Sequence, residues 1–330
     1  MITLPRVYGL SALAVGALSM ALPSCALAAS AEWRPERPVR LVLPFAPGGA
    51  ADIVARVLTP RFHEALGQPW VVDNRGGAGG NIAAEIVARA NPDGHTVFLG
   101  ISTAITVSPL LTRLAIDVAK DLAPVSMATA AQYLLVLHPS VNASTVKDLV
   151  ALAKSKPGAL NYASTGVGGP SFMATALFSQ RAGIWMTNIP YKGGGPAANA
   201  ILASEVHMVF LSIVAALPHV RAGRLKGVAV TGSRRAAVAP EIPTVAESGF
   251  PGFEVTTWYG LFLPGKSPER IVKTLDAETA KALALSEVVD VIARQGAEAA
   301  YKGPKDLADH IRKETAMWAR LIREAKITAE

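Results

Sequence analysis

Short apolar runs alternate along the chain with longer stretches in which apolar residues recur every three or four positions. The first such series predicts strands at residues 39–43, 70–72 and 96–99, separated by helices at residues 51–66 and 81–90. Alternating strands and helices at this spacing are typical of a parallel sheet with helices on both faces. The first part of the chain therefore predicts an α/β lobe.

A second series of the same kind begins near Tyr133. Its apolar runs predict strands, and its amphipathic stretches predict helices between them. We expect the strands at residues 133–137, 161–163, 187–191, 209–211 and 227–230, and the helices at residues 146–154, 171–183 and 196–203. This series predicts a second lobe of the same class.

No low-complexity linker lies between the two series. We therefore expect the chain to cross between the lobes in extended segments, near residues 122–132 and again near 253–263. Amphipathic patterns at residues 268–285, 286–295 and 304–327 predict helices at the end of the chain, which we expect to pack on the first lobe. Two lobes joined by two crossings form a hinged clam, with the ligand cleft at the carboxyl ends of the strands.

The predicted fold class is thus α/β with two lobes, each a mainly parallel sheet flanked by helices, and with a ligand cleft between the lobes. Residues 32–130 together with residues 256–330 are expected to form the first lobe, and residues 131–255 the second. About 300 residues, in a chain that is 51% hydrophobic, suffice for two such cores.

The first 31 residues differ from the rest of the chain. Arg6 is their only charged residue, and an apolar run at residues 10–22 is followed by small residues up to Ala31. This pattern predicts a signal peptide at residues 1–31, cleaved near its end. A membrane anchor is the alternative, but the run is too short to cross a bilayer. Cleavage after Cys25, the only cysteine, would leave no thiol for disulfides, metal sites or catalysis.

The charge balance excludes nucleic-acid binding. The chain has 32 basic and 25 acidic side chains, a formal net charge of +7, and loss of Arg6 with the leader lowers it by one. These charges are spread along the sequence and aromatic residues make up 6% of it, whereas nucleic-acid binding favours a basic stripe with interleaved aromatics. We expect no nucleic-acid partner and at most a mild attraction for anionic solutes.

Two glycine-rich turns each follow a predicted strand and precede a predicted helix. Pro47, Gly48 and Gly49 form the turn in the first lobe, and residues 164–171, with three glycines and several hydroxyls, form its counterpart in the second. Backbone N–H groups in such turns can approach an anion at the positive end of a helix. A purely structural turn is the alternative, but it would leave free amides facing an empty crevice. We therefore predict an anion site shared by the two turns.

Four other residues are candidates for the same site. Ser102 and Thr103 follow the strand at residues 96–99 and are placed to supply hydroxyl contacts. Asp52 stands at the start of the first long helix, where we interpret it chiefly as a cap for free amides, with a role in holding an amine or a water as the alternative. Tyr191 follows a strand, so its phenol either lines the cleft or packs on the surface of the lobe.

No residues indicate catalysis or a cofactor. Residues 260–267 fit the Walker A expression, but they continue a strand where a phosphate loop has to be flexible. Residues 164–166 resemble part of a nucleophile elbow, yet Tyr162 replaces its first glycine and no histidine is placed as a base. The six histidines show no spacing for metal ligands. We therefore predict no cofactor, no metal and no enzymatic activity.

Short motifs in nearly every part of the chain after the leader carry a family resemblance. They are PFAPGG at residues 44–49 with Asp52, LGQP at 66–69, VDNR at 72–75 with GAGGN at 77–81, NPDG at 91–94, KDLAPV at 120–125, AKSKPG at 153–158, PYKG at 190–193 and IPTVAESG at 242–249. Any one of these motifs is weak, but the ordered set is specific. It resembles the Bug family, the periplasmic receptors of tripartite tricarboxylate transporters.

The resemblance implies the two-lobed, type II-like fold of periplasmic binding proteins and residence in the periplasm. It implies delivery of an organic acid, amino acid or aromatic acid to the inner-membrane permease subunits of the transporter, with the ligand's carboxylate held mostly by backbone amides and bridging waters from both lobes. We expect the receptor to be a monomer. The predicted ligand-binding residues are Phe45, Ala46, Pro47, Gly48, Gly49, Asp52, Ser102, Thr103, Ser164, Thr165, Gly166, Gly168, Gly169, Ser171 and Tyr191.

The sequence departs from the family pattern in the second lobe. Phe172 and Ala176 stand where members commonly have a histidine and an acid, and Leu211 stands where an aspartate is frequent. These exchanges predict a less polar end of the pocket, suited to an aromatic or short aliphatic acid. Two other functions stay open at this point: a ligand sensor that docks on a signalling partner, and a secreted hydrolase or lyase that uses the same cleft.

Overall fold

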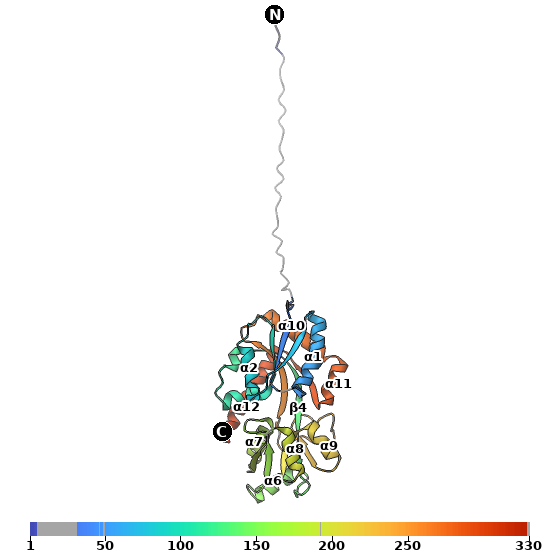
Figure 1. Cartoon of the computed structure of the whole chain (residues 1–330). Helices are drawn as coiled ribbons and strands as arrows, with labels where there is room; N and C mark the ends of the chain where they lie inside the picture. The colour runs from blue at the N-terminus through green and yellow to red at the C-terminus, as the bar shows by residue number, and fades with distance from the viewer. Residues whose placement is uncertain (5–31, 46, 49, 192, 329–330) are drawn as a thin grey trace. The chain divides into compact units, whose positions relative to one another are not determined.

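The protein is represented by a computed structural model that describes residues 1–4, 32–45, 47–48, 50–191 and 193–328. Apart from its first four residues, the predicted signal peptide, with Cys25, lies outside the described residues. Residues 32–330 form one compact unit. Figure 1 shows its helices gathered around two groups of strands, with β4 (Leu122–Leu137) running from one group into the other.

The first sheet contains three parallel strands, β1 (Val39–Leu43), β2 (Trp70–Asn74) and β3 (Thr96–Ile101), in the order β2-β1-β3. Helices α1 (Ala50–Leu66) and α2 (Asn81–Ala88) connect them. The buried residues of α1 recur every three to four positions, so one apolar side of the helix faces the sheet. The strands and helices predicted for this part of the chain are confirmed, with shifts of one or two residues at their ends.

The second sheet repeats this plan with β5 (Asn161–Ser164), β6 (Thr187–Pro190) and β7 (Met208–Ser212), which are parallel in the order β7-β5-β6. Helices α7 (Pro170–Ala182) and α8 (Gly194–Leu202) connect them. The other regular elements of this half are α6 (Val146–Ser155), α9 (Ile213–Arg221) and β8 (Lys226–Val230). The strands and helices predicted for this part of the chain are confirmed, and α9 is the short helix that follows β7.

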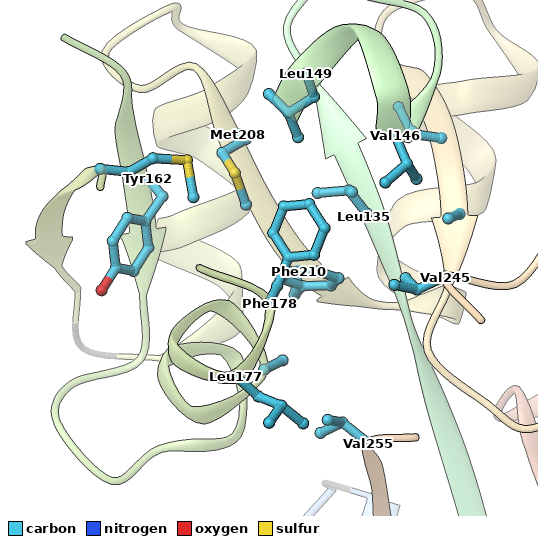
Figure 2. Packing of buried hydrophobic residues seen from close by; sticks show 14 of the residues in the cluster. Leu135, Val146, Leu149, Tyr162, Leu177, Phe178, Met208, Phe210, Val245 and Val255 are labelled. Carbon is cyan, nitrogen blue, oxygen red and sulfur yellow. The ribbon is translucent and has the colours of Figure 1, made fainter. Parts of the chain in front are cut away.

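The core beneath α6 and α7 is closely packed around Phe178 of α7 (Figure 2). The ring of Phe178 meets the ring of Phe210 edge to face, with centroids 6.0 Å apart, and packs in the same way against Phe250 and Phe253. Edge-to-face pairs of this kind add stability beyond the area they bury. This core fixes the end of β7 relative to the start of α7, and both elements reach the candidate site.

Two antiparallel strands join the sheets. Residues 122–132 of β4 pair with β9 (Thr256–Pro264), whereas residues 133–137 pair with β7 and β8, so β4 belongs to both sheets. The parallel strands predicted for each sheet are therefore joined by antiparallel ones in this region, because a chain that enters the second sheet and returns must run in opposite directions at the crossing. The lobe boundaries that we propose, at 130/131 and 255/256, fall inside β4 and directly before β9.

The remaining elements lie mostly around the first sheet. They are the short helices α3 (Ser102–Thr106), α4 (Ser108–Leu111) and α5 (Val118–Asp121), a single turn η1 (Ala78–Gly80), the helices α10 (Glu269–Leu283) and α11 (Ser286–Arg294), and the strand β10 (Ala297–Lys302). β10 was not predicted, because its alanine-rich sequence lacks strand periodicity. Within the described residues, every helix is too short or too polar to span a membrane.

The last helix, α12 (Pro304–Glu324), packs on both sheets. Leu307, near its start, belongs to a core cluster of the first sheet, whereas Trp318 and Leu321 belong to the core cluster of the second sheet. A hydrogen bond from Gln180 of α7 to Glu324 also ties its end to the second sheet. The expectation that all three terminal helices pack on the first lobe was thus wrong for α12, whose 21 residues extend about 30 Å.

Glu314 lies where α12 crosses between the sheets. Its carboxylate accepts a 2.8 Å hydrogen bond from the Trp258 indole N–H of β9. Burial raises the pKa of Glu314 to about 7, an effect that the indole hydrogen bond and the nearby Lys302 ammonium only partly offset. The folded protein therefore holds a proton on Glu314 that the unfolded chain releases near its ordinary pKa of 4.5.

We predict that Glu314→Gln removes a pH dependence of stability. Because the pKa is raised on folding, the contribution of Glu314 is fully present below about pH 4.5 and is lost as the pH rises through about 7. The variant should match the wild type at about pH 4 and exceed it by roughly 1 to 3 kcal/mol at pH 8.5. Urea unfolding at several pH values measures this difference, and a difference that does not change with pH would contradict the assignment.

Candidate ligand-binding site

A cavity of about 650 Å³ is lined by elements of both sheets. The first sheet contributes the end of β3, the start of α2, and α4. The second contributes the turn before α7, the start of α8, and the end of β7. The joining strands β4 and β9 contribute Tyr133, Thr257 and Tyr259. The cavity therefore lies at the carboxyl ends of the parallel strands, where open α/β sheets bind ligands.

Four helices of eight residues or more begin at the wall of this cavity. The lining includes Asn81, Pro170 and Gly194, the first residues of α2, α7 and α8, and Ser212, the residue that precedes α9. No side chain caps any of these four helix starts. The first amides of a helix have no acceptor within the helix, and the helix dipole makes this end positive. The cavity wall thus contains helix starts whose amides have no acceptor within their own helix, although the Asn81 amide itself donates to the Ala78 carbonyl in the preceding turn.

Missing caps alone do not identify the site, because α10, α11 and α12 also lack them. Away from the cavity, α6 has a full capping box between Thr145 and Asp148, and Asp117 caps α5. What distinguishes α2, α7, α8 and α9 is that their uncapped starts meet at one cavity. Such convergence gives the hollow a positive potential without any cationic side chain.

The structure divides the predicted site residues into two groups. Those that line the cavity are Phe45, Thr103, Thr165, Gly168, Gly169 and Ser171. Those that are described but are not part of its lining are Pro47, Gly48, Asp52, Ser102, Ser164, Gly166 and Tyr191. Ala46 and Gly49 lie outside the described residues.

The turn before α7 is held rigid by its own hydrogen bonds. The Thr165 amide donates to the Ser171 hydroxyl at 2.9 Å, the Gly166 amide to the Ser164 hydroxyl at 3.3 Å, and the Gly169 amide to the Gly166 carbonyl at 3.1 Å. These amides are therefore occupied within the turn. Because Pro170 has no N–H, the first amides that α7 itself leaves free are those that follow it, beginning with Ser171.

In the turn before α1, the Gly48 amide bonds to a side chain of the following helix. The Gly48 N–H donates to the Asp52 carboxylate at 3.2 Å, and the same carboxylate accepts bonds from the Arg56 guanidinium at 2.8 Å and the Asn74 amide at 3.3 Å. The hydrogen bond from Arg56 is the largest cause that lowers the pKa of Asp52, although burial opposes it. These contacts agree with the interpretation of Asp52 as a cap. They also mean that the Gly48 amide points to Asp52.

Tyr191 and the two exchanged residues of α7 lie away from the cavity wall. The Tyr191 hydroxyl donates to Glu205 at 3.1 Å and the ring packs on a core cluster of the second sheet, which favours the packing alternative. Phe172 and Ala176 are half-buried against the core under α7. Of the residues that depart from the family pattern, only Leu211 lines the cavity.

Sequence reasoning missed the contribution of the joining strands. The Tyr133 and Thr257 hydroxyls are 2.5 Å apart, and Tyr259 lines the cavity two residues further along β9. These residues are far apart in sequence and meet only because β4 pairs with β9, so no local pattern marks them. Asn81 could have been predicted as a site residue, because it follows a glycine run and starts a helix. Its buried side-chain oxygen has no partner among the described residues.

Comparison with known proteins identifies the family of this chain. The family model for the tripartite tricarboxylate transporter family receptor matches residues 54–327. The chain belongs to this family. BugT of Bordetella pertussis is 35% identical over 314 residues, which are 94% of this chain and 96% of that protein. A Pseudomonas sp. strain P51 protein of the UPF0065 group, named for the tcbD-tcbE intergenic region, is 36% identical over 89% and 88% of the two chains.

Solved structures of similar proteins share the fold. An R. palustris protein with adipate has a TM-score of 0.78 and 32% identity over 90% of this chain and 99% of that one. MatC from Rhodopseudomonas palustris, with bound malate, has a TM-score of 0.73 and 34% identity over 87% and 99% of the two chains. The periplasmic binding protein BugD has a TM-score of 0.74, with 30% identity over 90% and 100%. This receptor therefore has the two-lobed fold of the family's periplasmic solute-binding proteins.

The described residues of this receptor provide no cluster of three or more His, Cys, Asp or Glu side chains that would hold a metal ion. Among the cavity-lining residues that the structure describes there is no histidine, lysine, arginine or carboxylate. The arrangement offers hydrogen-bond donors, hydroxyls and apolar walls, which suit binding.

We predict that Gly169→Ala destabilises the turn before α7. A Cβ at this position would lie 2.5 Å from the Thr165 hydroxyl and 3.0 to 3.1 Å from two backbone carbonyl oxygens, which cannot move without opening the turn. We expect a loss of roughly 1 to 3 kcal/mol in unfolding free energy, measured in urea. Gly195→Ala is the matched control, because a Cβ there meets nothing within 4 Å, and it should leave stability unchanged or raise it. Equal losses in both variants would contradict the rigid turn.

Proposed function

We propose that this receptor captures a small carboxylate-bearing solute in the cavity and delivers it to the permease subunits of a tripartite tricarboxylate-type transporter. On this proposal the signal peptide directs the chain to the periplasm, where it acts as a monomer. The observation that carries the proposal is the convergence of four uncapped helix starts, from both sheets, on one cavity. Backbone donors at helix starts are a general means of binding anions.

The number of donors is sufficient for useful affinity. A hydrogen bond to a charged acceptor contributes about 1.5 to 3 kcal/mol. Four or five such bonds, less the cost of ordering the ligand and closing the lobes, reach the roughly −8 kcal/mol of micromolar binding. No arginine is needed, and the described lining contains none.

The relatives support an acid as the ligand. The two similar structures from R. palustris contain adipate and malate, both of which are carboxylates. The family description supports a transporter as the partner. Of the predicted site residues, Thr165 and Ser171 lie in the cavity wall next to the first free amides of α7 and are proposed to contact the carboxylate.

The connections between the sheets support closure around the ligand. The crossing consists of β4, β9 and α12, so movement of one sheet relative to the other would bend two paired strands and one helix. Hinges of this kind absorb domain closure at a few residues. A signalling role would use the same closure, and it differs from transport only in the partner that reads the closed form. A hydrolase or lyase is disfavoured because the described lining lacks an acid–base pair.

We predict that carboxylic acids raise the melting temperature of the purified protein, and that they are recovered chemically unchanged. Leu211, Phe210 and Val209 make one wall apolar, so aromatic and short aliphatic acids should bind more tightly than citrate, whose extra carboxylates would lose water without gaining partners. A thermal-shift panel followed by calorimetry measures this order. Citrate as the tightest ligand would contradict the apolar wall, and turnover of any acid would contradict a binding role.

A further inference from the structure

We infer that the cavity selects carboxylic acids that carry no ammonium group, and so excludes α-amino acids. This inference rests on the proposed function and narrows it to one class of ligand. It concerns the charge of the cavity wall: every helix start that favours an anion there disfavours a cation. The apolar part of the wall then favours a ligand with a hydrocarbon body.

The described lining has no negative side chain. Its only ionisable groups are the phenols of Tyr133 and Tyr259, and burial raises the pKa of both, that of Tyr133 to about 12, so both stay neutral. Residues 46, 49 and 192, which the structure does not describe, are alanine, glycine and lysine, and therefore add no carboxylate.

Two buried acidic residues, Asp52 and Glu314, are bonded to other side chains. Asp52 is 5% exposed, is not part of the lining, and is paired with Arg56 at 2.8 Å. Glu314 lines a small cavity that adjoins the main one and shares Thr103, Val107, Pro170 and Thr257 with it, but Glu314 is not part of the main lining and accepts the hydrogen bond of Trp258. Neither carboxylate is placed to pair with an ammonium group in the main cavity.

An ammonium group would bind unfavourably in this site for two reasons. It would lose water without gaining a counter-ion, which is costly because neutral acceptors such as the Asn81 side-chain oxygen compensate a desolvated charge only in part. It would also lie near the positive ends of α2, α7, α8 and α9. A hydroxyl at the same carbon of the ligand carries no charge and meets neither penalty.

The rest of the wall matches an apolar ligand body. Ile101, Val107 and Leu111 line the cavity from the first sheet, and Val167, Phe210 and Leu211 line it from the second. Both sheets therefore present hydrocarbon, beside the helix starts that would hold the carboxylate. The class that fits is a carboxylic acid with an apolar body and, at most, uncharged polar substituents.

Two matched sets of ligands test this inference by calorimetry on the purified protein. The aromatic set is 3-phenylpropanoate, 2-hydroxy-3-phenylpropanoate and phenylalanine, and the aliphatic set is succinate, malate and aspartate. Within each set the members differ at one carbon, which carries hydrogen, hydroxyl or ammonium. We expect the amino acid to bind at least 30-fold more weakly than the hydroxy acid in whichever set binds. An amino acid that binds as tightly as its hydroxy counterpart overturns this inference alone, whereas no binding by any of the six overturns the proposed function.

A charge placed in the wall gives a second, independent readout. Ser212 lines the cavity and precedes α9 without capping it, and aspartate is well tolerated at such a position. Ser212→Asp should reduce the preference for hydroxy acid over amino acid about 10-fold, because one added negative charge attracts the ammonium across the cavity. Ala215→Asp puts the same charge on the first turn of α9 at an exposed residue outside the lining, and should change the preference less than threefold. An unchanged preference in Ser212→Asp, or equal changes in both variants, would contradict the inference.

Discussion

Unpaired backbone amides at the starts of helices are the interaction on which the proposed site depends. A buried amide without a hydrogen-bond partner costs free energy. Where four uncapped helix starts meet at one cavity, water or a ligand must therefore supply acceptors for the free amides. α2 and the α7, α8 and α9 group come from different sheets. An anion that satisfies donors from both sheets at once therefore also stabilises the arrangement in which the sheets approach each other.

The rest of the fold places these helix starts. β4 is continuous through both sheets, and its pairing with β9 brings Tyr133 and Thr257 together in the wall of the cavity. α12 adds a third connection, because its first half packs on the first sheet and Trp318 packs in the core of the second. The buried Glu314 lies at the middle of this helix, so the ionisation of a single carboxyl falls on the segment that packs on both sheets.

Much of the fold could be predicted because its strands and helices are locally encoded. Most of the predicted strands are apolar runs, and α1 and α6 show the periodicity of a single buried face. The two crossings were predicted as extended segments, but the antiparallel pairing of β4 with β9 and the two-sided packing of α12 could not be predicted, since they depend on contacts between residues more than 100 positions apart. β10 was missed for a local reason, because alanine carries little strand preference.

In the candidate site too, local features could be predicted from the sequence and long-range contacts could not. The turn before α7 was identified from its glycines, and four of its predicted residues line the cavity. Sequence could not show that three amides of this turn are already bonded within it, or that Gly48 donates to Asp52. The roles of Tyr133, Thr257 and Tyr259 in the lining could not be predicted, because the residues that surround them in space are far from them in sequence.

The most direct measurement is the response of individual amides to a bound carboxylate. ¹⁵N-labelled protein would be titrated with 3-phenylpropanoate and, as a control, with its uncharged methyl ester, while the backbone N–H resonances are followed. Free amides at the starts of α7 and α8, those of Ser171 and Gly194 among them, should shift together with amides at the start of α2, and only with the acid. Shifts confined to one sheet, or equal shifts with the ester, would contradict binding of the anion by helix starts from both sides of the cavity.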